Sequence, residues 1–332
     1  MRVRQQAQID CSSMTTARTT TPINRTLIYI SLGLALLLVV GVLAGSKLVV
    51  QRFANQPVAL SPLPAPMAES KQCAELVSAL PERIAGHKRA ELAEPAPAGA
   101  AVWQSSSTER ITLRCGVDMP LQYTELTSTF SAAGAQWMKV TDPSGTGLAT
   151  WFTVDRSPVI AVTADKKALG QQENPVEDLG AETLSALAKE EPSPAPAPLA
   201  TLAEAEDYSA DDCSAFVAAL PDQIAEGYDA LAVEKLTGED PTRVRAWGGD
   251  GLEPVVVRCG VAEPESYEPG AFLTQVNEVP WFEDTDATTG TGTTLYALGR
   301  TANIALALPA GMGDEALNNL SAAIAKNVPA QT

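Results

Sequence analysis

The stretch that decides the fold occurs twice: residues 111–117 read ITLRCGV, and residues 255–261 read VVVRCGV. Each copy has the alternation of a half-buried β-strand, with its cysteine on the apolar face. Arg114 and Arg258 lie on the opposite face, which we expect to be the open side of a sheet. The repeated strand predicts two similar units, each with a cysteine in its core.

The repeat extends well beyond this strand. Cys73 opens the segment CAELVSALP, and Cys213 opens CSAFVAALP. Farther along, matched residues keep a separation of 144 positions: Trp103 with Trp247, Cys115 with Cys259, Pro120 with Pro264, Trp137 with Trp281, Arg156 with Arg300, and Ile160 with Ile304. A period this long indicates a duplicated globular domain rather than a solenoid. A chain of 332 residues is long enough for two such domains.

Near the N-terminus, residues 26–46 form a run of 21 residues without a charge. As a helix at about 1.5 Å per residue, this run extends roughly 31 Å, the thickness of a bilayer's hydrocarbon core. Four arginines precede the run, whereas only Lys47 and Arg52 follow closely, so the N-terminus is expected in the cytoplasm. The sequence predicts a single-pass membrane anchor with extracytoplasmic domains.

Other interpretations of this segment remain open. Ala44 and Ser46 are small residues at a spacing that signal peptidase accepts, although the apolar run exceeds the usual core of a signal peptide. Residues 43–46, LAGS, look like a bacterial lipobox in which serine replaces the acylated cysteine, so no lipid can be attached there. Met14 is an alternative start that would remove Cys11 and leave the span unchanged.

The five cysteines fit this topology. Cys11 lies on the reducing side and is expected to stay free, which leaves two cysteines for each copy in an oxidising compartment. One member of each pair lies on the apolar stripe of a predicted helix and the other on the buried face of a strand. We therefore expect the disulfides Cys73–Cys115 and Cys213–Cys259. A zinc site is the alternative, but the pairs lack CxxC spacing.

The remaining pattern predicts mostly strands, with helices gathered on one face of an antiparallel sheet. This arrangement is an α+β two-layer sandwich, present here twice in tandem behind one transmembrane helix. The cysteine helices, whose apolar stripes reach Ile84 and Ile224, should break after Leu80 and Leu220 because proline follows each. Further helices are expected near 123–133, 177–189, 269–276 and 314–327.

The predicted domain boundaries follow from these patterns. The segment between the two copies, rich in proline, alanine and acids, favours extended polyproline and should act as a semi-rigid spacer. In chain order we expect a cytoplasmic tail at 1–26, a transmembrane helix at 27–46, a linker at 47–72, the first copy at 73–189, the acidic linker at 190–212, and the second copy at 213–328.

Candidate functional residues are few. His87, the sole histidine, corresponds to Gly227 in the second copy and is expected to be exposed after a helix. Asp284 and Asp286 faintly suggest a calcium loop but lack the EF-hand pattern, so a solvated turn is the simpler interpretation. The matched tryptophans are expected in the cores. Possible surface or partner contacts are Arg114, Arg258, Arg156 and Arg300; the first pair could form exposed ion pairs, and the second could reach water or a carboxylate.

The motifs of each copy are, in order, a helix that begins at cysteine and continues as LxxLP, a strand with a tryptophan, the segment RCGV, and then a further tryptophan and an arginine. The order of these motifs resembles that of an actinobacterial family of secreted or lipid-anchored proteins. This family is catalogued as domain of unknown function 3515, and the resemblance covers both copies, from Cys73 to the C-terminus. Its members often have one copy, and many carry a lipobox cysteine where this chain has Ser46. The resemblance implies a cell-envelope location and no particular activity.

The function classes can be ranked from these observations. No catalytic, cofactor or metal site is predicted, and a net charge of −17 argues against nucleic-acid binding. The favoured interpretation is a non-catalytic envelope module that is anchored through 27–46 and binds a protein or wall component. A small-ligand or metal sensor and an envelope hydrolase or transferase are the alternatives.

The two copies differ in charge. Residues 69–191 carry 17 acidic and 11 basic residues, whereas residues 204–332 carry 22 acidic and 6 basic residues, a net of −16. The excess of acidic residues in the second copy suggests one of two functions: it keeps the protein soluble, or it steers the second copy toward a cationic partner.

Overall fold

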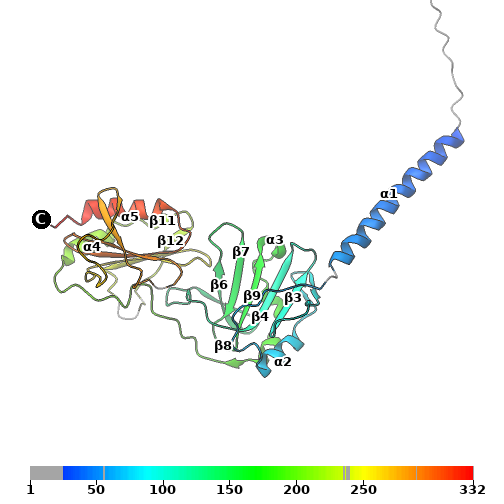
Figure 1. Ribbon diagram of the computed structural model, residues 1–332, viewed down its shortest axis with the longest axis horizontal. Coiled ribbons are helices and arrows are strands. Elements are labelled where there is room, and N and C mark those ends of the chain that lie inside the picture. Colours follow the sequence, from blue (N-terminus) through cyan, green and yellow to red (C-terminus); the bar gives the residue numbers. More distant parts are fainter. Residues whose placement is uncertain (1–24, 55–56, 235, 237–239, 289, 332) are drawn as a thin grey trace, which may run out of the picture. The chain divides into compact units, whose positions relative to one another are not determined.

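The computed structural model describes residues 25–54, 57–234, 236, 240–288 and 290–331 (Figure 1). These described residues fall into two compact units, divided between Arg52 and Phe53. The expectations for Cys11, Met14 and the cytoplasmic tail lie outside the described residues, apart from the tail's last two positions.

The described part of the N-terminal unit is formed by the helix α1 (Arg25–Ala54), which is 30 residues long and extends two residues past the unit's boundary. Its stretch Ile28–Lys47 has a mean hydropathy of 2.5 and is long and apolar enough to cross a membrane. All side chains from 28 to 44 are exposed, so they cover no protein core. A helix of this kind requires an apolar environment such as a bilayer, although an N-terminal signal sequence has the same properties.

The second unit contains two eight-stranded sheets with the same order of strands, and every pairing within them is antiparallel. The first sheet has the order β1-β2-β3-β4-β9-β7-β6-β5. Its strands are β1 (Arg83–Ile84), β2 (His87–Ala90), β3 (Ala100–Gln104), β4 (Arg110–Val117), β5 (Thr129–Ala132), β6 (Ala135–Thr141), β7 (Leu148–Thr153) and β9 (Val159–Asp165). A separate ribbon pairs β8 (Arg156–Ser157) with β10 (Ala188–Lys189).

The second sheet has the order β11-β12-β13-β14-β18-β17-β16-β15. Its strands are β11 (Gln223–Ala225), β12 (Tyr228–Ala230), β13 (Val244–Gly248), β14 (Val255–Cys259), β15 (Thr274–Val276), β16 (Val279–Glu283), β17 (Thr293–Ala297) and β18 (Ile304–Leu308). The helices are α2 (Lys71–Ala79) and α3 (Lys166–Leu169) with the first sheet, and α4 (Ala210–Ala218) and α5 (Asp314–Asn327) with the second. The predicted α+β class with two antiparallel sheets is confirmed.

The repeated cysteine strands, β4 and β14, lie in the middle of their sheets. Cys115 lies at bonding distance from Cys73 on α2, and Cys259 lies at bonding distance from Cys213 on α4. All four side chains are fully buried. Each helix is therefore linked to the sheet that it covers, as the sequence predicts.

A proline and a tryptophan fix the end of each cysteine helix. Leu80 already has an extended conformation (φ −62°, ψ 142°), and the carbonyl of Pro81 accepts a hydrogen bond from the indole nitrogen of Trp103 at 2.9 Å. Pro221 and Trp247 make the same bond at 2.9 Å. The predicted break is confirmed. The extension of the helical stripe to Ile84 and Ile224 is wrong, since both residues lie on the short strands that follow.

Some predicted helices are wrong. In the first copy, 177–189 contains two 3₁₀ helices, η1 (Val176–Leu179) and η2 (Thr183–Ala186), instead of one α-helix. Gly180 lies between them with φ 74° and ψ 148°, a conformation that no α-helix continues. The second copy has the full helix α5. The expected weak helices at 123–133 and 269–276 are instead turns that lead into β5 and β15.

The two linkers are not free spacers. Val58 in the first linker is buried and pairs with Leu92. In the second linker Ala197 and Leu199 are buried in an apolar cluster on the face of the second sheet opposite the disulfide. This segment thus offers apolar side chains to a sheet face that would otherwise be exposed, and it packs on the second sheet instead of acting as a free spacer.

Candidate functional site

The arginines of the repeated strand hold these linkers. Arg114 donates to the carbonyl of Ser61 at 2.6 Å, and Arg258 donates to the carbonyls of Leu199 at 3.0 Å and Leu202 at 2.6 Å. The expectation of an open sheet face with exposed ion pairs is therefore wrong for Arg258, which is 5% exposed. A guanidinium group has enough donors to satisfy several carbonyls of a segment that crosses it.

The glycine of the repeated strand allows the linker to approach. Gly116 has φ 83°, and a Cβ added there would lie 2.3 Å from the carbonyl carbon of Met67. Met67 donates its backbone N–H to the Gly116 carbonyl at 3.1 Å, and Ala205 donates to Gly260 at 3.0 Å. In the motif RCGV, the arginine and glycine thus bind the linker, while the cysteine binds the helix.

The other arginine pair is also occupied within the chain. Arg156 donates to the carbonyl of Gly134 and to the carboxylate of Asp155, and Arg300 donates to the carbonyls of Glu278 at 2.6 Å and Val328 at 3.2 Å. Arg156 is 5% exposed and Arg300 is 9% exposed, so both are shielded from water; the contact of Arg156 with Asp155 matches the expected carboxylate, whereas Arg300 binds carbonyls instead. Contact of any of these arginines with a partner remains a prediction.

His87 is buried on β2, which corrects the expectation of an exposed histidine. Its Nδ1 lies 2.7 Å from the hydroxyl of Ser105, and its Nε2 lies 2.6 Å from the carbonyl of Ala168. Because the carbonyl only accepts, Nε2 carries a proton, and Nδ1 shares its hydrogen bond with a hydroxyl that can donate or accept. The strand register places Tyr228, and not Gly227, in the equivalent position, since β11 contains one extra, bulged residue.

Tyr228 is buried like His87, so this position serves packing in both copies. A serine hydroxyl beside a histidine is a pair that nucleophilic catalysis can use. However, Ser105 lines none of the cavities described below, and the second copy has Gly249 in its place. The pair is therefore accounted for as a partly buried structural hydrogen bond.

Asp284 is 4% exposed, so the expectation of a solvated turn is wrong for this side chain, although Asp286 is exposed as expected. The Oδ1 of Asp284 accepts from the hydroxyl of Ser266 at 2.9 Å and from the backbone N–H of Asp286 at 3.1 Å. The carboxylate thus closes the turn between β16 and β17. Within the residues that the structure describes, no group of three His, Cys, Asp or Glu side chains is arranged to hold a metal ion.

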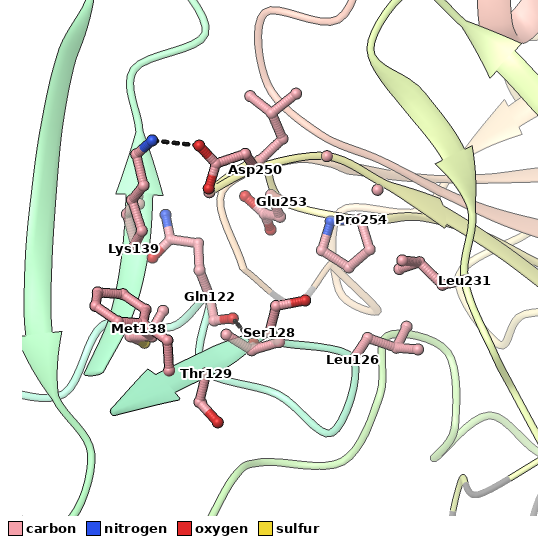
Figure 2. A pocket seen from close by; sticks show the side chains of 17 residues that line it. Gln122, Leu126, Ser128, Thr129, Met138, Lys139, Leu231, Asp250, Glu253 and Pro254 are labelled. Atoms are coloured by element: carbon pink, nitrogen blue, oxygen red, sulfur yellow. Dashed lines mark hydrogen bonds and ion pairs between the residues drawn. The ribbon is translucent and has the colours of Figure 1, made fainter. Parts of the chain in front are cut away.

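A cavity of about 250 Å³ is the best candidate for a binding site (Figure 2). One wall comes from the first sheet, where Ser128 and Thr129 lie at the start of β5 and Lys139 lies on β6. The opposite wall is the loop 248–254, between β13 and β14 of the second sheet. The site is thus built by both copies of the repeat.

Hydrogen bonds position the loop against β6. The backbone N–H of Thr141 donates to the carbonyl of Gly251 at 2.7 Å, and its hydroxyl donates to the carbonyl of Asp250 at 3.1 Å. Gly251 has φ 72°, and an added Cβ would lie 2.5 Å from the Thr141 hydroxyl, so this position requires glycine. Lys139 forms an ion pair with Asp250, drawn as a dashed line in Figure 2.

The cavity continues into two neighbouring hollows of about 320 and 250 Å³. Gln122 and Glu253 line all three, so we call the combined site the Gln122–Glu253 groove. It includes Asp142, Asp250 and Glu253, with Lys139 as the one basic residue among the lining residues that the structure describes. The groove therefore has an excess of negative charge.

Two of these carboxylates are held by hydroxyl and amide donors. Glu253 accepts from the hydroxyl and the backbone N–H of Thr291. Hydrogen bonds from Thr146 and then Ser144 lower the pKa of Asp142, so this group stays ionised at neutral pH. Among the described residues neither carboxylate forms an ion pair, and both can attract a cation.

The groove provides the contacts of a binding site: an amide, hydroxyls, carboxylates and apolar side chains such as Met138 and Leu231. Comparison of the sequences of the two copies does not predict this groove. Its walls use β5 and β6 of one copy and the loop 248–254 of the other, so its residues are not matched in the repeat. The one relevant signal is the glycine-rich run GGDG at 248–251.

Comparison with known proteins gives a family and no activity. No curated protein and no solved structure matches the chain. One family model matches twice, at residues 32–192 and 181–332, which is consistent with two tandem copies. Together these matches cover most of the chain, which therefore belongs to the family described as Protein of unknown function (DUF3515).

Proposed function

We propose that this protein is a membrane-anchored, extracytoplasmic binding module of the cell envelope, which holds a cationic protein partner in the Gln122–Glu253 groove. The observation that carries the proposal is the excess of carboxylates in a groove built jointly by the two copies. Carboxylates attract Lys and Arg side chains, and the negative charge of the second copy increases the rate of encounter. A binding function needs no catalytic group.

The two alternatives have less support. A metal or small-ligand sensor would need convergent ligands, and the described residues offer no such metal cluster. An envelope hydrolase or transferase would need a nucleophile at a cavity, and the serine beside His87 lines none of the three hollows. The groove residues are suited to holding a segment of a partner in place.

The proposed topology places the N-terminus in the cytoplasm and both sheets outside. The apolar helix and the two disulfides support it, since disulfides persist in oxidising compartments. Protease added to spheroplasts should degrade both sheets and leave a short protected N-terminal fragment. A mature chain that begins near Lys47 and is released into the medium would contradict anchoring.

Cross-linking in intact cells tests the binding function. A photoreactive amino acid at Thr129 should capture a partner with a Lys- or Arg-rich segment. Asp250→Asn should weaken this capture, because it adds an unpaired Lys139 to the groove. Asp222→Asn is the matched control, since Asp222 also forms an exposed ion pair, with Arg245, but lies outside the groove.

The salt dependence adds a second readout. Capture should decrease as added salt shortens the Debye length from about 10 Å at 0.1 M to about 3 Å at 1 M. Equal capture by both variants, or capture that is indifferent to salt, would contradict the proposal.

A further inference from the structure

We infer that the partner enters the groove as an extended, basic polypeptide segment that adds a strand to the free edge of β5. This inference rests on the proposed binding function and specifies its mode. Strand addition uses main-chain hydrogen bonds for affinity and alternate side chains for selectivity. Three observations carry it: the free backbone groups of β5, the lack of edge protection, and the charge of the groove.

The hairpin register shows which backbone groups of β5 are free. Ala133 and Gly134 have φ 48° and 75°, as in a two-residue type I′ turn. Opposite residues then alternate between pairs that exchange hydrogen bonds and pairs that do not, beginning with the bonded pair that flanks the turn. Ser131 lies opposite Gln136, and Thr129 lies opposite Met138, so both belong to pairs that do not exchange hydrogen bonds.

The contacts of Gln136 support this assignment independently. Its backbone N–H donates to the carboxylate of Asp155 at 2.9 Å, and its carbonyl accepts from Val154 at 2.9 Å. Both groups therefore point away from β5. The N–H and C=O groups of the opposite residue, Ser131, must then point to the outer edge of the sheet. Thr129, two residues earlier, has the same orientation.

Nothing in β5 blocks this edge. Its sequence, TFSA, contains no charge and no proline, which are the usual protections of an edge strand. The opposite edge strand, β1, has only two residues, one of them Arg83. Thr129 and Ser131 are exposed, and Thr129 is among the residues that line the groove. It lies on β5 in Figure 2.

The charge of the groove selects the occupant. Among the described residues Asp142 and Glu253 form no ion pair, while Lys139 is paired with Asp250. Because side chains of a strand alternate in direction, a segment with basic residues at every second position can direct them to these carboxylates. A second copy of this chain is a poor occupant, since its strongly acidic second repeat would be repelled.

The test uses the full chain in detergent micelles and a short fluorescein-labelled peptide in which lysine alternates with threonine. Ser131→Pro removes the outward N–H and should weaken peptide binding roughly five- to tenfold, as measured by fluorescence anisotropy. Ser131→Ala keeps this N–H and should bind like the parent chain. The matched control is Gln275→Pro, because Gln275 is the equivalent edge residue on β15 and lies opposite Pro280.

The outcomes separate this inference from the proposed function. Retained binding in Ser131→Pro with loss in Asp250→Asn would show that the groove binds without strand addition, and would overturn the inference alone. Equal weakening by Ser131→Pro and Gln275→Pro, or no binding of the lysine peptide above that of a glutamate analogue, would also overturn it. Unchanged thermal unfolding of the proline variants shows that each still folds.

Discussion

The two arginines of the repeated strand should contribute very different amounts to stability. Arg258 donates to two linker carbonyls and lies 3.7 Å from the carboxylate of Glu204, all while 5% exposed. Substitution by methionine keeps the apolar stem and removes the donors. We expect Arg258→Met to lower the free energy of unfolding of the second copy by about 3–5 kcal/mol, because a buried charged group loses two hydrogen bonds of about 1.5–3 kcal/mol each.

Arg114 provides the matched comparison. It is partly exposed and donates to the single carbonyl of Ser61, where water can replace it. Arg114→Met should therefore cost only about 1 kcal/mol. Unfolding in guanidinium chloride, followed by hydrogen exchange at peptide resolution, measures the stability of each copy separately. Equal losses in the two variants, or no measurable loss in Arg258→Met, would refute the view that the arginine of the second copy holds its linker.

Two more predictions concern buried groups of the second copy. Ser321→Ala should cost about 1–3 kcal/mol in chemical unfolding, because it removes the hydroxyl that accepts from the buried indole of Trp281 at 2.9 Å. Ser78→Ala, which loses only an exposed bond to the carbonyl four residues earlier, should change stability by less than about 0.5 kcal/mol. Burial, and then the charge of Asp284, raises the pKa of Tyr296 to about 12. Because the folded chain keeps this proton longer than the unfolded chain, stability should fall between about pH 10 and pH 12, by at most about 2–3 kcal/mol. Tyr296→Phe should reduce this fall, and an identical alkaline unfolding curve would contradict the assignment.

The sequence predicts the covalent and apolar framework because each of its signals is local and repeated. The alternation around Cys115 predicts the central strand, and Pro81 predicts the end of the helix. The sheet face on which Arg258 lies is also predicted correctly, but the prediction that this face is open to solvent is wrong. Whether a sheet face is open depends on where a distant linker runs, and no local pattern contains that information.

The errors elsewhere have similar causes. His87 looked like an exposed residue in a comparison that matched it with Gly227, because a bulge of one residue shifts the register without leaving a clear mark in the sequence. The helix expected at 177–189 has the right apolar residues, yet Gly180 interrupts it. The Gln122–Glu253 groove arises from contacts between unmatched parts of the two copies, so the repeat itself concealed it.

The path of the linkers determines where a repeat of this kind can be duplicated or truncated. The segment that begins at the first cysteine of a copy is not a self-sufficient unit, since residues 197–202 lie upstream of Cys213 and cover the far face of its sheet. A truncated chain starting at Cys213 would uncover buried side chains such as Val256 and Ala305 and should aggregate. A gene duplication that produces a soluble second copy must therefore carry the upstream segment with it, and recombination within that segment would be selected against.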